Sequence, residues 1–246
     1  MNLLRFALVL AVATSLAADP LGDVRAALGK LTASQPIRAT YELQRSVANE
    51  GKFDNDTFTG KAVVELEGEG GDFRVVLPRP LLDQVSREQE AWTQDVNRST
   101  PTVSALSEIS PVAAADAIDF APTLLRMMHG AKLVSDTAST FQGKPARALV
   151  LRLADRLDKE NAGRVKISEN RLTLWLGADL IPVGAEHLLN SKFSFLIFKG
   201  EGKRKNSWYF TQIADRLVRV RHESTESGSG MGQKSNESVV ATVKVH

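Results

Sequence analysis

Runs in which apolar and polar residues alternate constrain the fold of this chain more than any other feature. Ile37, Ala39, Tyr41 and Leu43 alternate with polar residues, and the same two-residue period returns from Phe58 to Glu67. Because successive side chains of a strand point to opposite faces, each run predicts a strand with one buried face. Further strand-like runs are Phe73 to Leu77, Ala146 to Leu153, Leu172 to Leu176, Phe193 to Phe198, Trp208 to Ile213, Leu217 to His222 and Val239 to Val245. Their spacing of roughly ten to twenty residues predicts a meandering antiparallel sheet.

Helical periodicity occurs at the start and in the middle of the chain. Apolar residues recur at intervals of three and four from Pro20 to Leu31, which predicts an amphipathic helix. The spacing from Leu81 to Val96 also predicts a helix, and the Ser-, Thr- and Pro-rich stretch from Asn97 to Pro111 predicts a loop. Ser110 and Pro111 then have the pattern of an N-cap followed by the first helical residue, opening a helix over Val112 to Ile118.

The helical block continues to Gly130. Pro122 restarts a helix whose apolar face carries Leu124, Leu125 and Met128, and Gly130 ends it. The fold class expected is therefore α+β and β-rich, with an N-terminal helix and a helical insertion at about residues 80–130. We expect residues 18–246 to form a single domain.

The N-terminus has the organisation of a cleavable signal peptide. Arg5 precedes an apolar core from Phe6 to Val12, and small residues stand at Ser15 and Ala17. We expect residues 1–17 to be removed by cleavage after Ala17, with Ala18 as the next choice, and the mature protein to be periplasmic or secreted. The apolar run is shorter than the ~20 residues that span a bilayer, and we expect no transmembrane segment after cleavage.

Composition excludes several classes of site. The chain has no cysteine, which removes disulfides and thiolate chemistry, so an exported domain of this kind must be held by its core. Acidic and basic residues are interleaved and the formal charge is only +2, which does not favour a nucleic-acid partner despite a pI near 8.9. The one basic cluster, Lys199 to Lys205, is spaced by glycines and predicts a solvated hairpin loop.

No motif for catalysis, metal binding or a cofactor is recognised. The four histidines, at 129, 187, 222 and 246, are not spaced as metal-ligand pairs. The Asp54-Asn55-Asp56 stretch lacks the later ligands of a calcium loop, and Gly228-Ser229-Gly230 lacks the flanking pattern of a nucleophile elbow. Pairs of carboxylates could still serve acid–base chemistry, because spacing along a β-rich chain does not report proximity.

Two local sequences resemble the periplasmic half-barrel proteins of the outer-membrane lipoprotein-sorting superfamily, which includes the lipoprotein carrier. Leu174-Trp175-Leu-Gly-Ala-Asp-Leu-Ile-Pro182-Val183 is similar to a strand, turn and following strand of that superfamily. Phe73-Arg-Val-Val-Leu-Pro-Arg79-Pro80 is similar to the carrier's strand that ends in an arginine–proline pair. The order of elements, including the strand that contains Ile37-Arg-Ala-Thr-Tyr41, is also similar. The resemblance implies a strongly curved, unclosed antiparallel sheet around an apolar cavity with a lid of central helices.

The same resemblance implies a role for Arg79, because the carrier's arginine keeps the lid closed by hydrogen bonding. After this arginine–proline pair the carrier continues as a strand, whereas Leu81 to Val96 here has helical spacing. Independently, the concave side of a curved sheet covered by helices is a common site for small ligands. Leu124, Leu125 and Met128 would then line the pocket, or would simply pack their helix onto the sheet.

Three functions remain open from the sequence. The leading hypothesis is noncatalytic periplasmic binding of a lipid, acyl chain or other hydrophobic ligand, with Arg79, Leu124, Leu125 and Met128 as ligand-binding residues. The second is an envelope protein–protein interaction module with a filled interior. The third is a secreted hydrolase with unrecognised carboxylates. An apolar cavity of several hundred Å³ under the helices would favour the first, and an exposed apolar patch the second. Polar groups with perturbed pKa values in a cleft would favour the third.

Overall fold

The computed structural model describes residues 19–51, 57–69, 72–155, 163–195, 198–230 and 233–246. The predicted signal peptide and the Asp54-Asn55-Asp56 stretch lie outside these residues. The described strands are β1 (Ile37–Glu50), β2 (Thr57–Glu69), β3 (Asp72–Val76), β4 (Lys132–Phe141), β5 (Lys144–Arg152), β6 (Val165–Leu176), β7 (Pro182–Phe195), β8 (Phe198–Ile213), β9 (Arg216–Gly230) and β10 (Gln233–Val245). The described helices are α1 (Pro20–Leu28), α2 (Arg79–Gln94), α3 (Pro101–Ser107), α4 (Pro111–Ile118) and α5 (Ala121–Met127).

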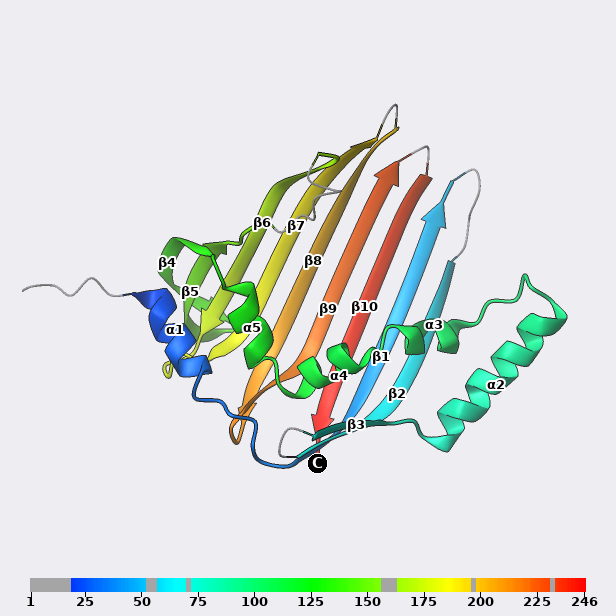
Figure 1. Ribbon diagram of the computed structural model, residues 1–246, viewed down its shortest axis with the longest axis horizontal. Helices are drawn as coiled ribbons and strands as arrows, with labels where there is room; N and C mark the ends of the chain where they lie inside the picture. The colour runs from blue at the N-terminus through cyan, green and yellow to red at the C-terminus, as the bar shows by residue number, and fades with distance from the viewer. Residues whose placement is uncertain (1–18, 52–56, 70–71, 156–162, 196–197, 231–232) are drawn as a thin grey trace, which may run out of the picture.

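All ten strands belong to one antiparallel sheet, in the order β3-β2-β1-β10-β9-β8-β7-β6-β5-β4 (Figure 1). Strands β4 to β10 follow one another as a meander, as the sequence predicted. The last strand then pairs with the first, from Ala39 opposite Val245 to Glu50 opposite Lys234. Because β3 and β4 are the two edges and do not pair with each other, the sheet is an unclosed half-barrel. The predicted fold class is confirmed.

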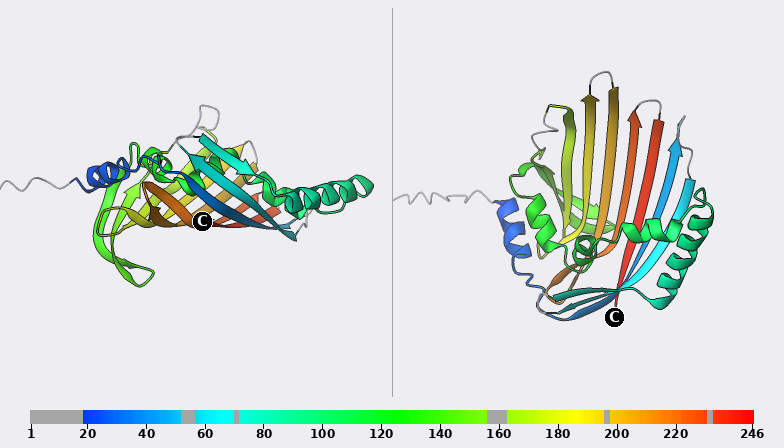
Figure 2. Two further views of the ribbon diagram at one scale, coloured as in Figure 1. Left: turned by 90° about the horizontal axis from the view of Figure 1, so that it is seen from below. Right: turned by 45° about the vertical axis from the view of Figure 1, so that its right-hand side comes forward.

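The helices lie on one face of the sheet, which we call the helix-bearing face, and cross only part of it (Figures 1 and 2). Two apolar clusters fill the space between helices and sheet. One joins α1 and α5 to strands β5 to β9, and the other joins α3 and α4 to β1, β2, β9 and β10. The clusters meet on β9, where Leu217 belongs to the first and Val218 to the second. At their far ends, strands β6 to β10 extend beyond the helices.

Local sequence signals explain where the helices start and stop. The Asp19 carboxylate accepts a hydrogen bond from the Gly22 amide (3.0 Å), and the Ser110 hydroxyl accepts one from the Ala113 amide (3.1 Å). These N-caps satisfy amides that the first helical turn leaves without partners. Gly130 adopts a φ of 74° just after α5, a conformation that costs glycine little and therefore ends the helix there. The predicted starts of α1 and α4 and the predicted end of α5 at Gly130 are confirmed, whereas α1 ends at Leu28 and not at the predicted Leu31.

The loop predicted from Asn97 to Pro111 is wrong in its centre, where α3 forms. Pro101 occupies the first turn of the helix, where a missing amide hydrogen has no cost. Ala105 is fully buried and Leu106 packs against the second cluster, so burial stabilises a helix that is too short to show a clear period. An alanine methyl at Gly60 on β2 would collide with the Pro101 carbonyl, so α3 lies directly on the sheet.

The hairpin loop predicted for Lys199 to Lys205 is also wrong, because the whole cluster lies within β8. Its residues pair with β7 on one side, and on the other side β9 pairs from Gly200 onward. The glycines misled the prediction, since glycine is more common in turns than in strands. The predicted strand from Phe193 to Phe198 instead spans the end of β7 and the start of β8.

None of the helices in the described part of the chain has the length and hydropathy of a membrane span.

Candidate functional site

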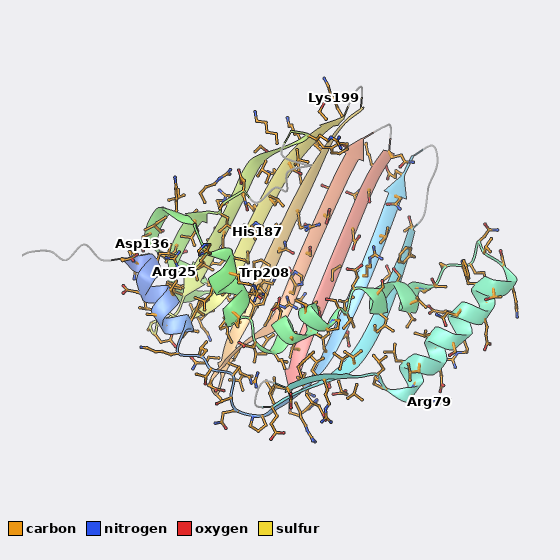
Figure 3. The ribbon with its side chains drawn as sticks, viewed as in Figure 1. Arg25, Arg79, Asp136, His187, Lys199 and Trp208 are labelled. Atoms are coloured by element: carbon orange, nitrogen blue, oxygen red, sulfur yellow. The ribbon has the colours of Figure 1, made fainter. Side chains whose placement is uncertain are left out.

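The residues predicted to line a pocket lie in the packed core under α5. Leu124 and Met128 have no exposed surface and belong to the first apolar cluster, and Leu125 is partly buried against it. The helix is also tied to α1, because the Arg25 guanidinium donates to the Met128 carbonyl at 2.7 Å. Figure 3 shows Arg25 on the side of α1 near α5. The side chains of this segment therefore fill the space between helix and sheet.

Arg79 lies at the other end of the molecule. It begins α2, its side chain is 84% exposed, and its Nε lies 2.8 Å from Asp83 Oδ1 in the same helix. Figure 3 shows Arg79 at the outer end of the sheet, well separated from α5. The structure therefore does not bring Arg79 together with Leu124, Leu125 and Met128.

Helix α2 projects from the edge of the sheet beyond β2 and β3 and contacts α3 (Figure 2). Leu81 is its one buried residue, and Val85 packs against the second cluster. The Glu88 carboxylate accepts hydrogen bonds from the Thr102 and Val103 amides (2.8 and 3.2 Å), which are otherwise unpaired at the start of α3. Burial tends to raise the pKa of Glu88, but hydrogen bonds from Thr102, Gln84 and Val103 outweigh it and lower this pKa.

The rest of α2 exposes apolar side chains. Of the nine large hydrophobic residues that are exposed in the described part of the chain, five lie on α2 or next to it. We call these five the α2 surface: Val76, Leu77, Leu82, Trp92 and Val96. Trp92 is 49% and Val96 69% exposed. Leu82 and Trp92 lie on α2 itself, Val76 and Leu77 precede the helix and Val96 follows it. Scattered single apolar residues are ordinary on a protein surface, whereas several near one projecting helix make it a candidate interaction site.

Aromatic and polar side chains form a second group at the boundary between the covered and uncovered parts of the helix-bearing face. The Trp208 ring stacks with the rings of His187 and His222, with centroid distances of 6.4 and 6.0 Å. Figure 3 labels His187 and Trp208. His187 Nε2 is 2.9 Å from Asn170 Oδ1, and His222 Nε2 is 3.1 Å from Asn206 Oδ1. The sequence gave no sign of this group, because its members come from four strands whose pairing could not be predicted.

Both histidines are neutral in the folded protein at neutral pH. Burial, reinforced by the positive charge of Arg219, lowers the pKa of His222 to about 3. Burial and Arg204 also lower the pKa of His187. A general base works best with a pKa near the operating pH, so the low pKa of His222 does not suit it to that role. Among the described residues, no group of three or more His, Asp or Glu side chains could hold a metal ion.

Comparisons with known proteins do not assign the chain to a family. No protein family and no curated protein matches its sequence. A solved structure of a DUF1329 family protein from Desulfovibrio piger ATCC 29098 aligns at 11% identity over 92% of both chains, with a TM-score of 0.29. MucB, solved in complex with MucA(peri), aligns at 10% identity over 91% of this chain and 94% of its own, with a TM-score of 0.24. Scores this low establish neither a family nor a function, and membership of the lipoprotein-sorting superfamily stays a prediction.

Proposed function

We propose that this protein is a noncatalytic binding module of the cell envelope that docks a partner protein through the α2 surface. The observation that carries the proposal is the contrast between a filled interior and an exposed projecting helix. The space where a carrier would hold its ligand contains Leu124, Met128 and Leu149, all without exposed surface. Five of the nine exposed large hydrophobic residues in the described part of the chain lie instead on α2 or next to it.

The α2 surface has the chemistry of a protein interface. Tryptophan is among the residues that contribute most to binding energy when a partner covers them. Trp92 is half-exposed at one end of the helix and Leu82 is 39% exposed at the other, so a partner can bury both. Arg79 and Asp83 form an ion pair, and the exposed Arg87 and Glu90 carry opposite charges, so the helix has no large excess of one charge and apolar contact can supply the affinity. Because α2 packs against α3, a partner can bind α2 without disturbing the sheet.

Site-specific crosslinking in cells tests this proposal. A photoreactive amino acid at position 92 should capture one defined protein, and the same group at Arg38, which is exposed on the opposite face of the sheet, should not. The purified partner should then lose at least about tenfold in affinity for Leu82→Ser and Trp92→Ser. Equal labelling at both positions, or unchanged affinity of both variants, would refute a specific role for α2.

A hydrophobic-ligand carrier is the second candidate, and one observation supports it. Leu31, Leu125 and Met127 are partly buried at the margin of the first cluster, where an acyl chain could reach apolar side chains if α5 moved outward. Native mass spectrometry of the mature protein from its own host, followed by lipid extraction, separates the two candidates. A lipid in near-stoichiometric amount would favour the carrier, whereas an apo mass that takes up no added fatty acid would favour the interaction module.

A further inference from the structure

The uncovered end of the helix-bearing face contains a hollow whose floor is bare backbone. On β8 and β9, Gly200 lies directly opposite Gly230, and Gly202 lies directly opposite Gly228. Gly200 and Gly202 precede Trp208 on β8 by even numbers of residues and without a bulge, so they share its face of the sheet. Gly230 and Gly228 lie on the same face because they are the direct partners of these glycines on β9. An added Cβ at Gly202 would have only the Ser191 hydroxyl within 4 Å (3.4 Å), and one at Gly228 only the Glu201 carbonyl (3.9 Å). The backbone of this pair is therefore open to a ligand.

The register places a frame of different side chains around the glycines. Ser191 on β7 and Ser235 on β10 flank the Gly202–Gly228 pair in one row across the sheet. Phe193 and Gln233 flank the Gly200–Gly230 pair in the next row. The hollow has a volume of about 520 Å³, within the range of about 300–1,000 Å³ that is usual for small-ligand sites. Figure 3 places Lys199, next to Gly200, at the end of the sheet away from the helices.

Phe193 supplies an apolar wall. Its ring occupies the space that a side chain at Gly200 would need, yet the residue remains 42% exposed. Glycines in neighbouring strands commonly mark places where a ligand approaches the backbone closely. A ring-shaped ligand could lie flat on this floor with one edge against Phe193.

The polar rim restricts what that ligand can be. The side chains of Ser191, Gln233 and Ser235 make no hydrogen bond within the described part of the chain, so they are available to a ligand. The charges nearest the inner end cancel, because Arg204 Nε donates to Glu226 Oε2 at 2.8 Å. Three other charged residues border the hollow, but their side chains belong to the opposite face of the sheet, because they alternate along their strands with residues of the helix-bearing face: Glu50, Glu201 and Lys234. An acyl chain would cover the polar groups of the rim without satisfying them, and a charged ligand would find no free counter-charge in the Arg204–Glu226 pair. A ligand with an apolar ring face and a hydroxyl-bearing edge satisfies both conditions.

We infer that this glycine hollow binds a neutral saccharide, with one pyranose ring lying on the Gly202–Gly228 floor beside Phe193. The hydroxyl groups of Ser191 and Ser235 and the Gln233 amide would bind the hydroxyls of the sugar. The hollow shares no residue with the α2 surface, so this inference extends beyond the proposed docking function and does not depend on it.

The test uses the full mature chain and three probes: maltotriose, triacetylchitotriose and sodium decanoate. Titration followed by amide NMR should show at least one of the saccharides binding in the millimolar range or tighter, with shifts at Gly202 and Gly228. Gly228→Val fills open space and Phe193→Ala removes the wall, so each should weaken binding by about tenfold or more. Ser229→Val is the matched control, because the Ser229 backbone borders the hollow but its side chain is on the opposite face of the same strand.

Three outcomes would overturn the inference. The first is that neither saccharide binds the wild-type chain at millimolar concentration. The second is that a saccharide binds but Gly228→Val and Ser229→Val have the same effect, which would put the site elsewhere. The third is that decanoate alone binds and Gly228→Val blocks it, which would make the hollow an acyl site. Circular dichroism of each variant establishes that it is folded, and none of these outcomes bears on docking at α2.

Discussion

At the scale of single residues, burial separates the core positions of α5 from its margin. Leu124 has no exposed surface and Leu125 is only partly buried. Leu124→Ala should therefore lower the free energy of unfolding by about 2–5 kcal/mol, since it removes buried carbons and leaves a cavity. Leu125→Ala should lower the free energy of unfolding by clearly less than Leu124→Ala. Urea denaturation of the two variants measures the difference, and equal small losses would show that α5 is loosely packed, as a lid would be.

The partly buried His222 next to Trp208 should make stability depend on pH. The pKa of His222 is about 3 in the folded protein, against about 6.5 in an unfolded chain. The unfolded state therefore binds more protons between these values, and stability should fall as pH decreases from 6.5 to 3. For this one group, the free energy of unfolding falls by at most about 1.4 kcal/mol per pH unit.

His222→Gln tests that dependence, because glutamine does not titrate. Urea midpoints measured at several pH values should decline less steeply for the variant than for the wild type over this window. NMR titration of the His222 ring in the folded protein checks the cause directly. A ring that takes up its proton near pH 6.5 would contradict the burial argument.

At the scale of elements, Glu88 links α2 to α3. Its carboxylate accepts from two amides at the start of α3, as an N-cap side chain would. Glu88→Ala should destabilise this pair by about 0.5–2 kcal/mol and speed hydrogen exchange in α2 and α3. Glu90→Ala on the same helix is the control, since Glu90 is exposed. If exchange in α3 is the same in both variants, the Glu88 contacts do not hold α2 in place.

The elements that could be predicted from sequence are those whose signal is local. The Ser110–Pro111 start of α4 and the Gly130 end of α5 depend on chemistry within one turn, and both predictions are confirmed. Helix α3 was missed because it is short and is stabilised by contacts with β2. The Lys199–Lys205 segment was predicted to be a loop because of its glycines. Its place in β8 depends on pairing with β7 and β9, which the sequence does not show.

The candidate sites depend on relations between distant residues, which the sequence does not contain. Arg79 and Leu124 were grouped as ligand-binding residues, yet Arg79 begins α2 and Leu124 lies on α5, two helices that Figure 1 shows well apart. The glycine hollow combines residues of β7, β8, β9 and β10 in a register that follows from three strand pairings. The only sign of the hollow in the sequence is that glycine occupies every second position at 200 and 202 and again at 228 and 230. Turns account for such glycines equally well.

At the scale of the whole molecule, the two apolar clusters share one continuous sheet. Leu217 and Val218 are neighbours on β9 but belong to different clusters. Phe120 packs on Trp208 in the first, and the Arg219 guanidinium, 5.3 Å from the Phe120 ring centroid, donates to the Ala113 carbonyl of α4. Breaking either cluster would expose apolar surface of the other through this strand. We therefore expect a single cooperative unfolding transition.

Leu149→Ala in the first cluster and Val64→Ala in the second test this coupling, because both side chains have no exposed surface. Each variant should shift the urea midpoint without changing the slope of the transition, and tryptophan fluorescence should coincide with far-ultraviolet circular dichroism. The sequence has three tryptophans, so these measurements use a background with Trp92→Phe and Trp175→Phe, in which Trp208 alone reports on the first cluster. In that background, a Val64→Ala variant whose fluorescence and dichroism separate would show that the clusters unfold independently. In that case α1 and α5 could open while α3 and α4 stay packed, and the carrier hypothesis would regain a physical route for its ligand.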